Sequence, residues 1–262
     1  MDNVNKTLYI PLYGKAYVSR KGILLDDPKA EEIWAAEGFP LKGKSKSKWL
    51  AYYMGMRSAV FDRYVQTQME MHPGSVVLHL GCGLDSRVLR VGTQGHMWYD
   101  VDFPEVIRER QRFYDETDTY KMISGDLRES GWRDMVAGKC AIVVLEGVSM
   151  YLRREELHAL LEHLAERFDD VELLMDCYTE FAARMSRVRN PVKDVGVSLV
   201  YGLDDPRGLE SAALAFVEEL PMTPAELIDN LQGMEKTIFR KLYAGKTAGK
   251  LYRMYAYSTC RG

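Results

Sequence analysis

The segment VVLHLGCGLDSRVLR, residues 76–90, constrains the fold of this chain more than any other stretch. An apolar run ends in Gly81-Cys82-Gly83, and polar, Arg-bearing residues follow at once. Glycine has no Cβ, so the backbone can turn sharply there and come close to a flat ligand. The pattern predicts a buried strand that leads into a ligand-binding turn.

Further apolar runs follow this turn at intervals that mostly leave room for a crossover helix. The runs at 76–80 and 141–145 are continuously apolar, as parallel strands are when helices cover both faces of a sheet. We therefore predict an α/β sheet with these two strands at its centre. The predicted strands are residues 76–80, 97–101, 120–124, 141–145, 171–175 and, as a late antiparallel strand, 251–260.

Helical patterns occupy the remaining segments. Residues 153–168 carry a stripe of leucines, and Pro104 stands where the first turn of a helix tolerates proline. Residues 28–37 and 49–70 also have a helical pattern. The sequence TPAE at 223–226 resembles a capping box with proline at the first helical position, and predicts a final helix.

The residues at the strand ends indicate a nucleoside ligand. Asp102 lies 19 positions after Gly83, a spacing at which a carboxylate can accept both ribose hydroxyls. A dinucleotide fingerprint would have Gly or Ala three residues after Gly83, where this chain has Ser86. The pattern therefore indicates a nucleoside without a pyrophosphate, and it disfavours a nicotinamide oxidoreductase.

Two more carboxylates follow predicted strands. Asp126 follows the strand at 120–124, where it could accept from an adenine amino group, and Glu146 follows the central strand at 141–145. Taken alone, each carboxylate is explained more simply as a polar residue where a strand ends at the solvent. Together with the glycine turn they converge on one crevice, which favours an adenosine that carries positive charge and no phosphate. S-adenosylmethionine fits that description.

Five successive segments resemble the leucine carboxyl methyltransferase and polyketide-synthesis O-methyltransferase family, within the class I S-adenosylmethionine-dependent methyltransferases. They are VVLHLGCGLDSRVLR, YDVDFPEVIRER, SGDLRE, LEGVSMYL and YGLDDPRGLE. The resemblance implies a Rossmann-like sheet of seven strands, mostly parallel, with helices on both faces and an antiparallel final strand. It also implies a methyltransferase with S-adenosylmethionine as its cofactor.

The resemblance implies roles for individual residues as well. Arg57, in MGMRSAVFDRYV, matches an arginine that binds the methionine carboxylate of the cofactor. Gly81 and Glu146 would border the methionine part, and Asp102 would bind the ribose. The residues expected to bind the cofactor are Arg57, Gly81, Gly83, Asp102, Asp126, Leu127 (through its backbone, with the adenine) and Glu146.

We expect a single domain over residues 1–262, since this length can bury one substantial core. Residues 1–70 would form an N-terminal helical cap and 75–177 the cofactor-binding half. Residues 178–210 would be an inserted cap on the substrate side, and 211–262 would supply a C-terminal helix and strands.

The expected reaction is O-methylation, with the carboxylate of a small polyketide-like or aromatic acid as acceptor. A carboxylate is already ionised at neutral pH, so no catalytic base is required, and none is evident in the sequence. Tyr151 is the candidate beside the methyl group, although core packing explains it equally. Arg184 and Arg187 could hold an acidic substrate, although a solvated helix face explains them at least as well.

Charge and composition limit the other ligands. The net charge of -3, with both signs scattered, gives no reason to expect nucleic acid, and no apolar run could span a bilayer. The start is not a secretory signal, which favours the cytoplasm, and no metal motif is present. The alternatives left open are a protein C-terminal carboxylate or a hydroxyl as acceptor, and a cofactor-binding module without turnover.

Overall fold

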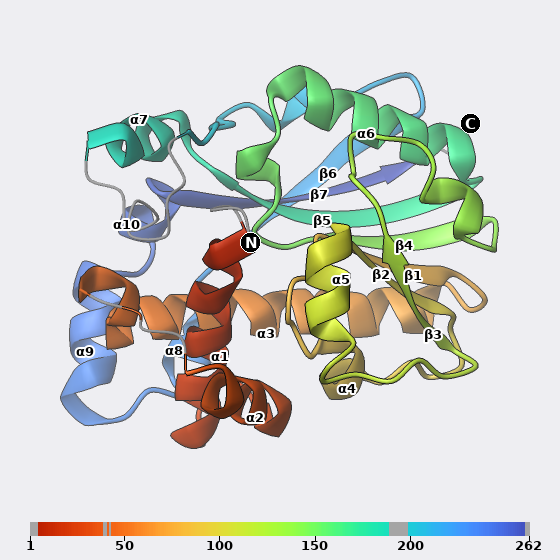
Figure 1. Ribbon diagram of the computed structural model, residues 1–262. Coiled ribbons are helices and arrows are strands. Elements are labelled where there is room, and N and C mark those ends of the chain that lie inside the picture. Colours follow the sequence, from red (N-terminus) through yellow and green to blue (C-terminus); the bar gives the residue numbers. More distant parts are fainter. Residues whose placement is uncertain (1–4, 39–40, 42, 189–198, 260–262) are drawn as a thin grey trace.

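The computed structural model describes residues 5–38, 41, 43–188 and 199–259, and its centre is one sheet of seven strands (Figure 1). Their order is β3-β2-β1-β4-β5-β7-β6. Strands β1 to β5 pair in parallel, whereas β7 runs antiparallel between β5 and β6. The strands are β1 (Val76–Leu80), β2 (Trp98–Asp102), β3 (Tyr120–Ser124), β4 (Cys140–Leu145), β5 (Asp170–Tyr178), β6 (Leu214–Leu220) and β7 (Tyr252–Thr259). The predicted fold class, a mostly parallel Rossmann-like sheet, is confirmed.

Helices cover both faces of this sheet (Figure 1). Helix α6 packs on one face, whereas α3, α4 and α5 pack on the other, where α1 lies against both α2 and α3. The helices are α1 (Tyr9–Arg20), α2 (Pro28–Glu37), α3 (Lys48–Met71), α4 (Arg87–Val91), α5 (Pro104–Arg110), α6 (Arg154–Arg167), α7 (Glu180–Val188), α8 (Ala225–Ile228), α9 (Gly233–Leu242) and α10 (Lys246–Gly249). A short 3-10 helix, η4 (Ser149–Tyr151), follows β4.

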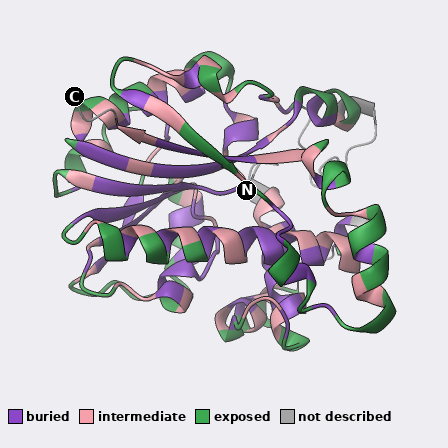
Figure 2. Cartoon of the chain, turned by 180° about the vertical axis from the view of Figure 1, so that it is seen from behind, coloured by how far each residue is buried: buried purple, intermediate pink, exposed green. Residues whose placement is uncertain are grey.

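The apolar runs become the buried centre of the molecule, as Figure 2 shows in purple. Every residue of β1 is buried, and so is every residue of β4 after Cys140. The predicted leucine stripe of α6 faces this core, because its four leucines are all buried. Pro104 is at the start of α5, as predicted.

The C-terminal part differs from the prediction. The capping box at 223–226 is wrong: the N-cap residue is Pro224, without a side-chain cap bond, so the proline lies one residue before the helix. The helix after it, α8, is only four residues long and is not the final one, since α9 and α10 follow. The seventh strand and an N-terminal helical cap were expected, but no residue range was predicted for strand β6 or for helix α1.

The segments outside the alternating core lie near the carboxyl ends of the parallel strands. Residues 1–70 supply α1, α2 and most of α3, and residues 178–210 supply α7. Helices α7, α9 and α10 gather at this end of the sheet, beside α1 (Figure 1). Among the described residues, no helix combines the length and the apolar character that crossing a membrane requires.

Candidate cofactor and acceptor site

One large pocket, of about 1060 Å³, opens at the carboxyl ends of the central strands. All seven predicted cofactor residues line it, although they come from α3 and from four different strand ends. Parallel strands place their carboxyl ends at one edge of a sheet, which is why residues far apart in the sequence meet there. Their individual binding roles remain predictions.

The glycine turn after β1 adopts the backbone that its composition predicts. Gly81 and Gly83 have φ angles of +69° and +53°, in the left-handed region that favours glycine. A Cβ on Gly81 would lie 2.3 Å from Cγ2 of Val148, so a side chain there is also excluded by contact. The Gly83 N–H donates to Oδ2 of Asp102 at 2.8 Å, which links the turn to the end of β2.

Asp102 is held ready to accept further hydrogen bonds. The N–H of Phe103 donates to its Oδ1 at 2.8 Å, so each carboxylate oxygen is oriented by one backbone donor. Each oxygen keeps a further lone pair for a ribose hydroxyl. Burial raises the pKa of Asp102 to about 6, despite these two donors.

Asp126 lies after β3 and is paired with a residue that the sequence analysis did not consider. Arg128 donates from Nε to both carboxylate oxygens of Asp126, at 2.9 and 3.0 Å. This pairing lowers the pKa of Asp126, so the carboxylate stays charged. Arg128 is exposed and also lines the pocket, beside the predicted adenine end.

The opposite end of the pocket holds a buried network of charged side chains. Nε and Nη2 of Arg57 contact Oε1 of Glu146 at 3.2 and 3.1 Å, and its Nη1 contacts Oδ2 of Asp176 at 2.9 Å. Glu146 also pairs with Arg87. Burial opposes the charge on Glu146, but Lys15, Arg87 and Arg57 together hold the pKa of its carboxyl group well below the usual range.

Several members of this network were missed in the sequence, Arg87 among them. Lys15, from α1, lies 2.8 Å from Asp85 and 3.5 Å from Glu146, and it lines the pocket. Asp176, in β5, accepts from Arg57 and from the Gly147 N–H. His79, in β1, has a pKa lowered by burial, which leaves its ring neutral at pH 7.

Another part of the pocket is uncharged and rich in aromatic residues. We call it the acceptor half, and define it as the lining residues within 47–54, 148–152, 178–186 and 242–252. None of the lining residues that the structure describes in these segments is Asp, Glu, His, Lys or Arg. Its aromatic residues are Trp49, Tyr53, Tyr151, Tyr178, Tyr243 and Tyr252. Apolar packing joins the segments, since Leu50, Met150 and Ala183 belong to one cluster.

Tyr151, part of η4, lines the acceptor half, and its role remains a prediction. Tyr178 and Tyr252 are nearby members of the same apolar cluster, and their rings meet edge to face at 4.6 Å. Burial raises the pKa of all three hydroxyls. They can donate hydrogen bonds to an acceptor, but they are protonated at neutral pH and cannot serve as bases.

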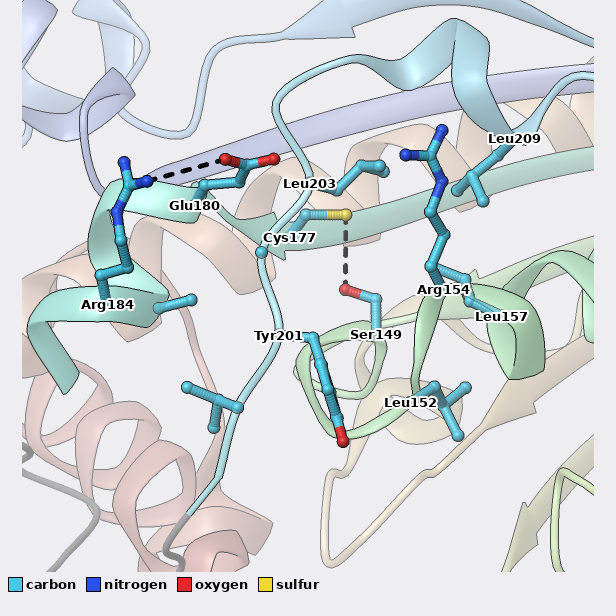
Figure 3. A pocket seen from close by; sticks show the side chains of 13 residues that line it. Ser149, Leu152, Arg154, Leu157, Cys177, Glu180, Arg184, Tyr201, Leu203 and Leu209 are labelled. Atoms are coloured by element: carbon cyan, nitrogen blue, oxygen red, sulfur yellow. Dashed lines mark hydrogen bonds and ion pairs between the residues drawn. The ribbon is translucent and has the colours of Figure 1, made fainter. Parts of the chain in front are cut away.

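Arg184 lies outside the large pocket. It lines a smaller cavity of about 210 Å³ between α7 and η4, together with Ser149 and Cys177 (Figure 3). Its side chain is 70% exposed and lies 4.0 Å from Glu180 on the same helix, which matches a solvated helix face. Arg187 is on α7 too, but its side chain falls outside the described part of the structure.

The described part of the chain shows neither a reactive thiolate in the large pocket nor a metal site. Cys82 lines the large pocket, but burial raises the pKa of its thiol far above the usual value, so it is not a reactive thiolate. Over the described ranges, no group of three or more His, Cys, Asp or Glu side chains could hold a metal ion.

Most of the chain is similar in sequence to known methyltransferases. The family model described as leucine carboxyl methyltransferase matches residues 12–165. The tetracenomycin polyketide synthesis O-methyltransferase TcmP of Streptomyces glaucescens is 28% identical over 243 residues, which cover 91% of this chain and 90% of that protein. The S-adenosyl-L-methionine-dependent methyltransferase dpfgK of Gibberella zeae is 29% identical over 184 residues, covering 64% and 62%.

Solved structures share the fold at low sequence identity. A DUF574 family protein from Streptomyces avermitilis matches with a TM-score of 0.58 and 13% identity, over 90% of each chain. Magnesium protoporphyrin IX methyltransferase from Synechocystis, in a structure with bound SAH, matches with a TM-score of 0.51 and 14% identity, over 94% of this chain and 97% of that one. These likenesses concern the sheet and its covering helices.

Proposed function

From the premise that the chain belongs to the leucine carboxyl methyltransferase family and is an S-adenosylmethionine-dependent methyltransferase, we propose that it methylates the carboxylate of a small polyketide-like or aromatic acid. The product is a methyl ester. The proposal concerns the acceptor and the residues that bind each partner, and it rests mainly on the contrast between the two halves of the pocket.

The charged half of the pocket fits the cofactor. The methionine part of S-adenosylmethionine carries a carboxylate and an ammonium, and the network offers both signs close together: Lys15 and Arg57 for the carboxylate, Glu146 and Asp85 for the ammonium. The glycine turn leaves room for backbone contact, and Asp102 faces the pocket with free lone pairs. When bound, the cofactor supplies a methyl group on a positively charged sulfur.

The observation that carries the choice of acceptor is the lack of a base in the acceptor half. Among its described lining residues no side chain can accept a proton at neutral pH, since the tyrosines there with a perturbed pKa all have it raised. A phenol or alcohol would need a base to reach its reactive form. A carboxylate, with an ordinary pKa of roughly 4, is ready to react without one.

The apolar lining also favours transfer to a carboxylate on electrostatic grounds. An anionic acceptor and a cationic donor give neutral products, so charge disappears along the reaction. Tyr151, Met150 and their neighbours solvate charge poorly. They therefore destabilise the charged acceptor and the charged cofactor before reaction more than the transition state, in which both charges are partly neutralised. The pocket can then promote the reaction by holding the acceptor in line and excluding water.

A small aromatic acid suits this half better than a protein terminus. Six aromatic residues line it, and one relative, TcmP, is by name an O-methyltransferase of polyketide synthesis. Aromatic and apolar walls with a few hydroxyl donors are typical of small-molecule sites.

The test is transfer of labelled methyl from S-adenosylmethionine into separate small-molecule and protein fractions of a cell extract. We expect label in a small molecule, released as methanol by mild base. Asp102→Ala should weaken cofactor binding by roughly 1–3 kcal/mol and so slow transfer at low S-adenosylmethionine, whereas Arg63→Ala, at an exposed surface ion pair, should keep the wild-type rate. Base-stable label would show a different acceptor atom, and base-labile label in protein would show that the acceptor is a protein carboxylate.

A further inference from the structure

Two aromatic rings from distant parts of the chain form one surface in the acceptor half. Trp49 lies in the first turn of α3, and Tyr243 directly follows α9. Their rings are stacked, with centroids 5.0 Å apart and planes 16° apart. Both residues line the large pocket and both are only partly buried, so part of each ring is accessible from the pocket.

The surrounding side chains hold this pair in place. Phe239, which is fully buried, stacks on Tyr243 at 5.8 Å, and Tyr53 meets Tyr243 edge to face at 6.4 Å. The Tyr53 hydroxyl donates to the backbone carbonyl of Tyr243, which ties α3 to the end of α9. Tyr52 contacts Trp49 edge to face, and Nζ of Lys48 lies over the Trp49 ring, 4.8 Å from its centroid. The pair is therefore preorganised, and a ligand need not order it on binding.

The chemistry of the Trp49–Tyr243 pair determines which kind of ligand it can bind well. Stacked rings leave edges accessible, and ring edges carry the positive side of the aromatic quadrupole. They attract the electron-rich face of another aromatic ring more than a saturated ring of the same size. None of the described lining residues of the acceptor half is charged, so the aromatic rings, the apolar side chains and the hydroxyl groups are what can recognise the body of the ligand.

We propose that Trp49 and Tyr243 select the acceptor, favouring acids built on planar aromatic rings over saturated acids of equal carbon number. This inference rests on the proposed function and adds the residues that determine specificity. Their contacts do not involve the charged half. Substitutions at this pair should therefore change acceptor binding while leaving cofactor binding intact.

The test uses two acids with the same carbon skeleton, planar aromatic 2-naphthoic acid and saturated decahydro-2-naphthoic acid. Their binding to the full chain saturated with S-adenosylhomocysteine is measured by calorimetry. Wild type should bind the aromatic acid about five-fold or more tightly than the saturated one. Trp49→Leu and Tyr243→Leu should each bring the two affinities to within about two-fold, and Trp49→Phe should restore most of the preference.

The control is Phe216→Leu, which removes an aromatic ring on β6 that does not line the large pocket. It should keep the wild-type preference. The proposal is overturned if wild type binds neither acid, if it binds both equally, or if the leucine variants keep the preference. Failure of the proposed function looks different: S-adenosylhomocysteine would not bind, or no methyl ester would form in the extract.

Discussion

Asp102 is the residue whose protonation should govern cofactor binding near pH 6. Burial raises the pKa of its carboxyl group to about 6, so it loses its charge as the pH falls through that value. The protonated form is a poorer acceptor for two ribose hydroxyls. We expect the dissociation constant for S-adenosylhomocysteine, measured by calorimetry, to rise about ten-fold between pH 7 and pH 5.

Asp102→Asn is the matched control, because an amide does not titrate in this range. The variant should bind more weakly than wild type at pH 7, and its affinity should stay constant down to pH 5. Asp126 and Glu146 have lowered pKa values and remain charged throughout. A variant that keeps the wild-type pH dependence would show that another group titrates.

Substitution of Gly81 tests whether the turn after β1 requires glycine. Alanine at Gly81 adopts an unfavourable φ of +69° and also meets Val148, whereas alanine at Gly95 adopts φ +87° with nothing within 4 Å. Gly95→Ala should cost about 1–2 kcal/mol of unfolding free energy from backbone strain alone. Gly81→Ala should cost more in urea denaturation and weaken cofactor binding. Equal costs would mean that Val148 moves aside freely.

The positions of the candidate cofactor residues at one pocket could be predicted one by one because strand ends carry a positional signal. Asp102, Asp126 and Glu146 each follow an apolar run, so a single rule places them at the same edge. Lys15 and Asp176 have no such signal. Lys15 comes from a segment without a recognisable pattern, and Asp176 lies within a buried strand, where only the three-dimensional pairing with Arg57 reveals it.

Helix α6 allows a test of how much the helices that cover the sheet contribute to the free energy of unfolding. Its Leu164 is fully buried against the sheet, in the stripe that the sequence predicts. Leu164→Ala removes buried methyl groups and leaves a cavity, so it should cost roughly 2–5 kcal/mol of unfolding free energy. Leu89→Ala, at a side chain 57% exposed on α4, should change it by less than about 0.5 kcal/mol. Urea denaturation of both variants measures the difference, and similar losses would contradict this account of the core.

Helices and strands that bury one face could be predicted from the spacing of their apolar residues. Elements in which the apolar residues do not recur at regular spacing could not. In α1 the buried residues lie on several sides, because the helix packs against both α2 and α3, and Pro11 and Gly14 weaken its helical pattern further. Strand β6 is at the edge of the sheet, has a single buried residue, Leu214, and has an irregularity between Phe216 and Glu218. An edge strand with a bulge lacks the alternation that sequence patterns detect.

Across the whole molecule, buried charges join the N-terminal helices to the sheet. Arg87, fully buried in α4, contacts Asp62 of α3 at 2.7 Å and Asp85 at 3.3 Å, and it also pairs with Glu146 after β4. Lys15 adds α1 to the same network. The candidate cofactor pocket therefore lies where the N-terminal helices meet the sheet. The division of the chain into a cap and a cofactor-binding half remains a prediction.

Replacing Arg87 with Met should show that charge, and not only packing, stabilises this junction. Burial disfavours the charge on Asp85, but Arg90, Lys15 and Arg87 hold its pKa well below the usual range. A carboxylate with a lowered pKa stabilises the fold above its unfolded pKa of about 4, and this contribution is lost as the pH falls. Arg87→Met leaves buried carboxylates poorly paired and should cost roughly 3–5 kcal/mol at pH 7. In urea denaturation at pH 4, where the carboxyl groups can take up protons, the cost should be clearly smaller.

The pH dependence separates this explanation from a simple packing defect, which would cost the same at both pH values. Arg63→Met is the matched control, because Arg63 is 60% exposed and pairs with Glu226 at the surface. It should change the unfolding free energy by less than about 1 kcal/mol at either pH. Since the same carboxylates border the proposed methionine end, Arg87→Met should also weaken S-adenosylhomocysteine binding at pH 7, whereas Arg63→Met should not. An Arg87 variant that is destabilised equally at both pH values and binds normally would contradict a role for this network in shaping the site.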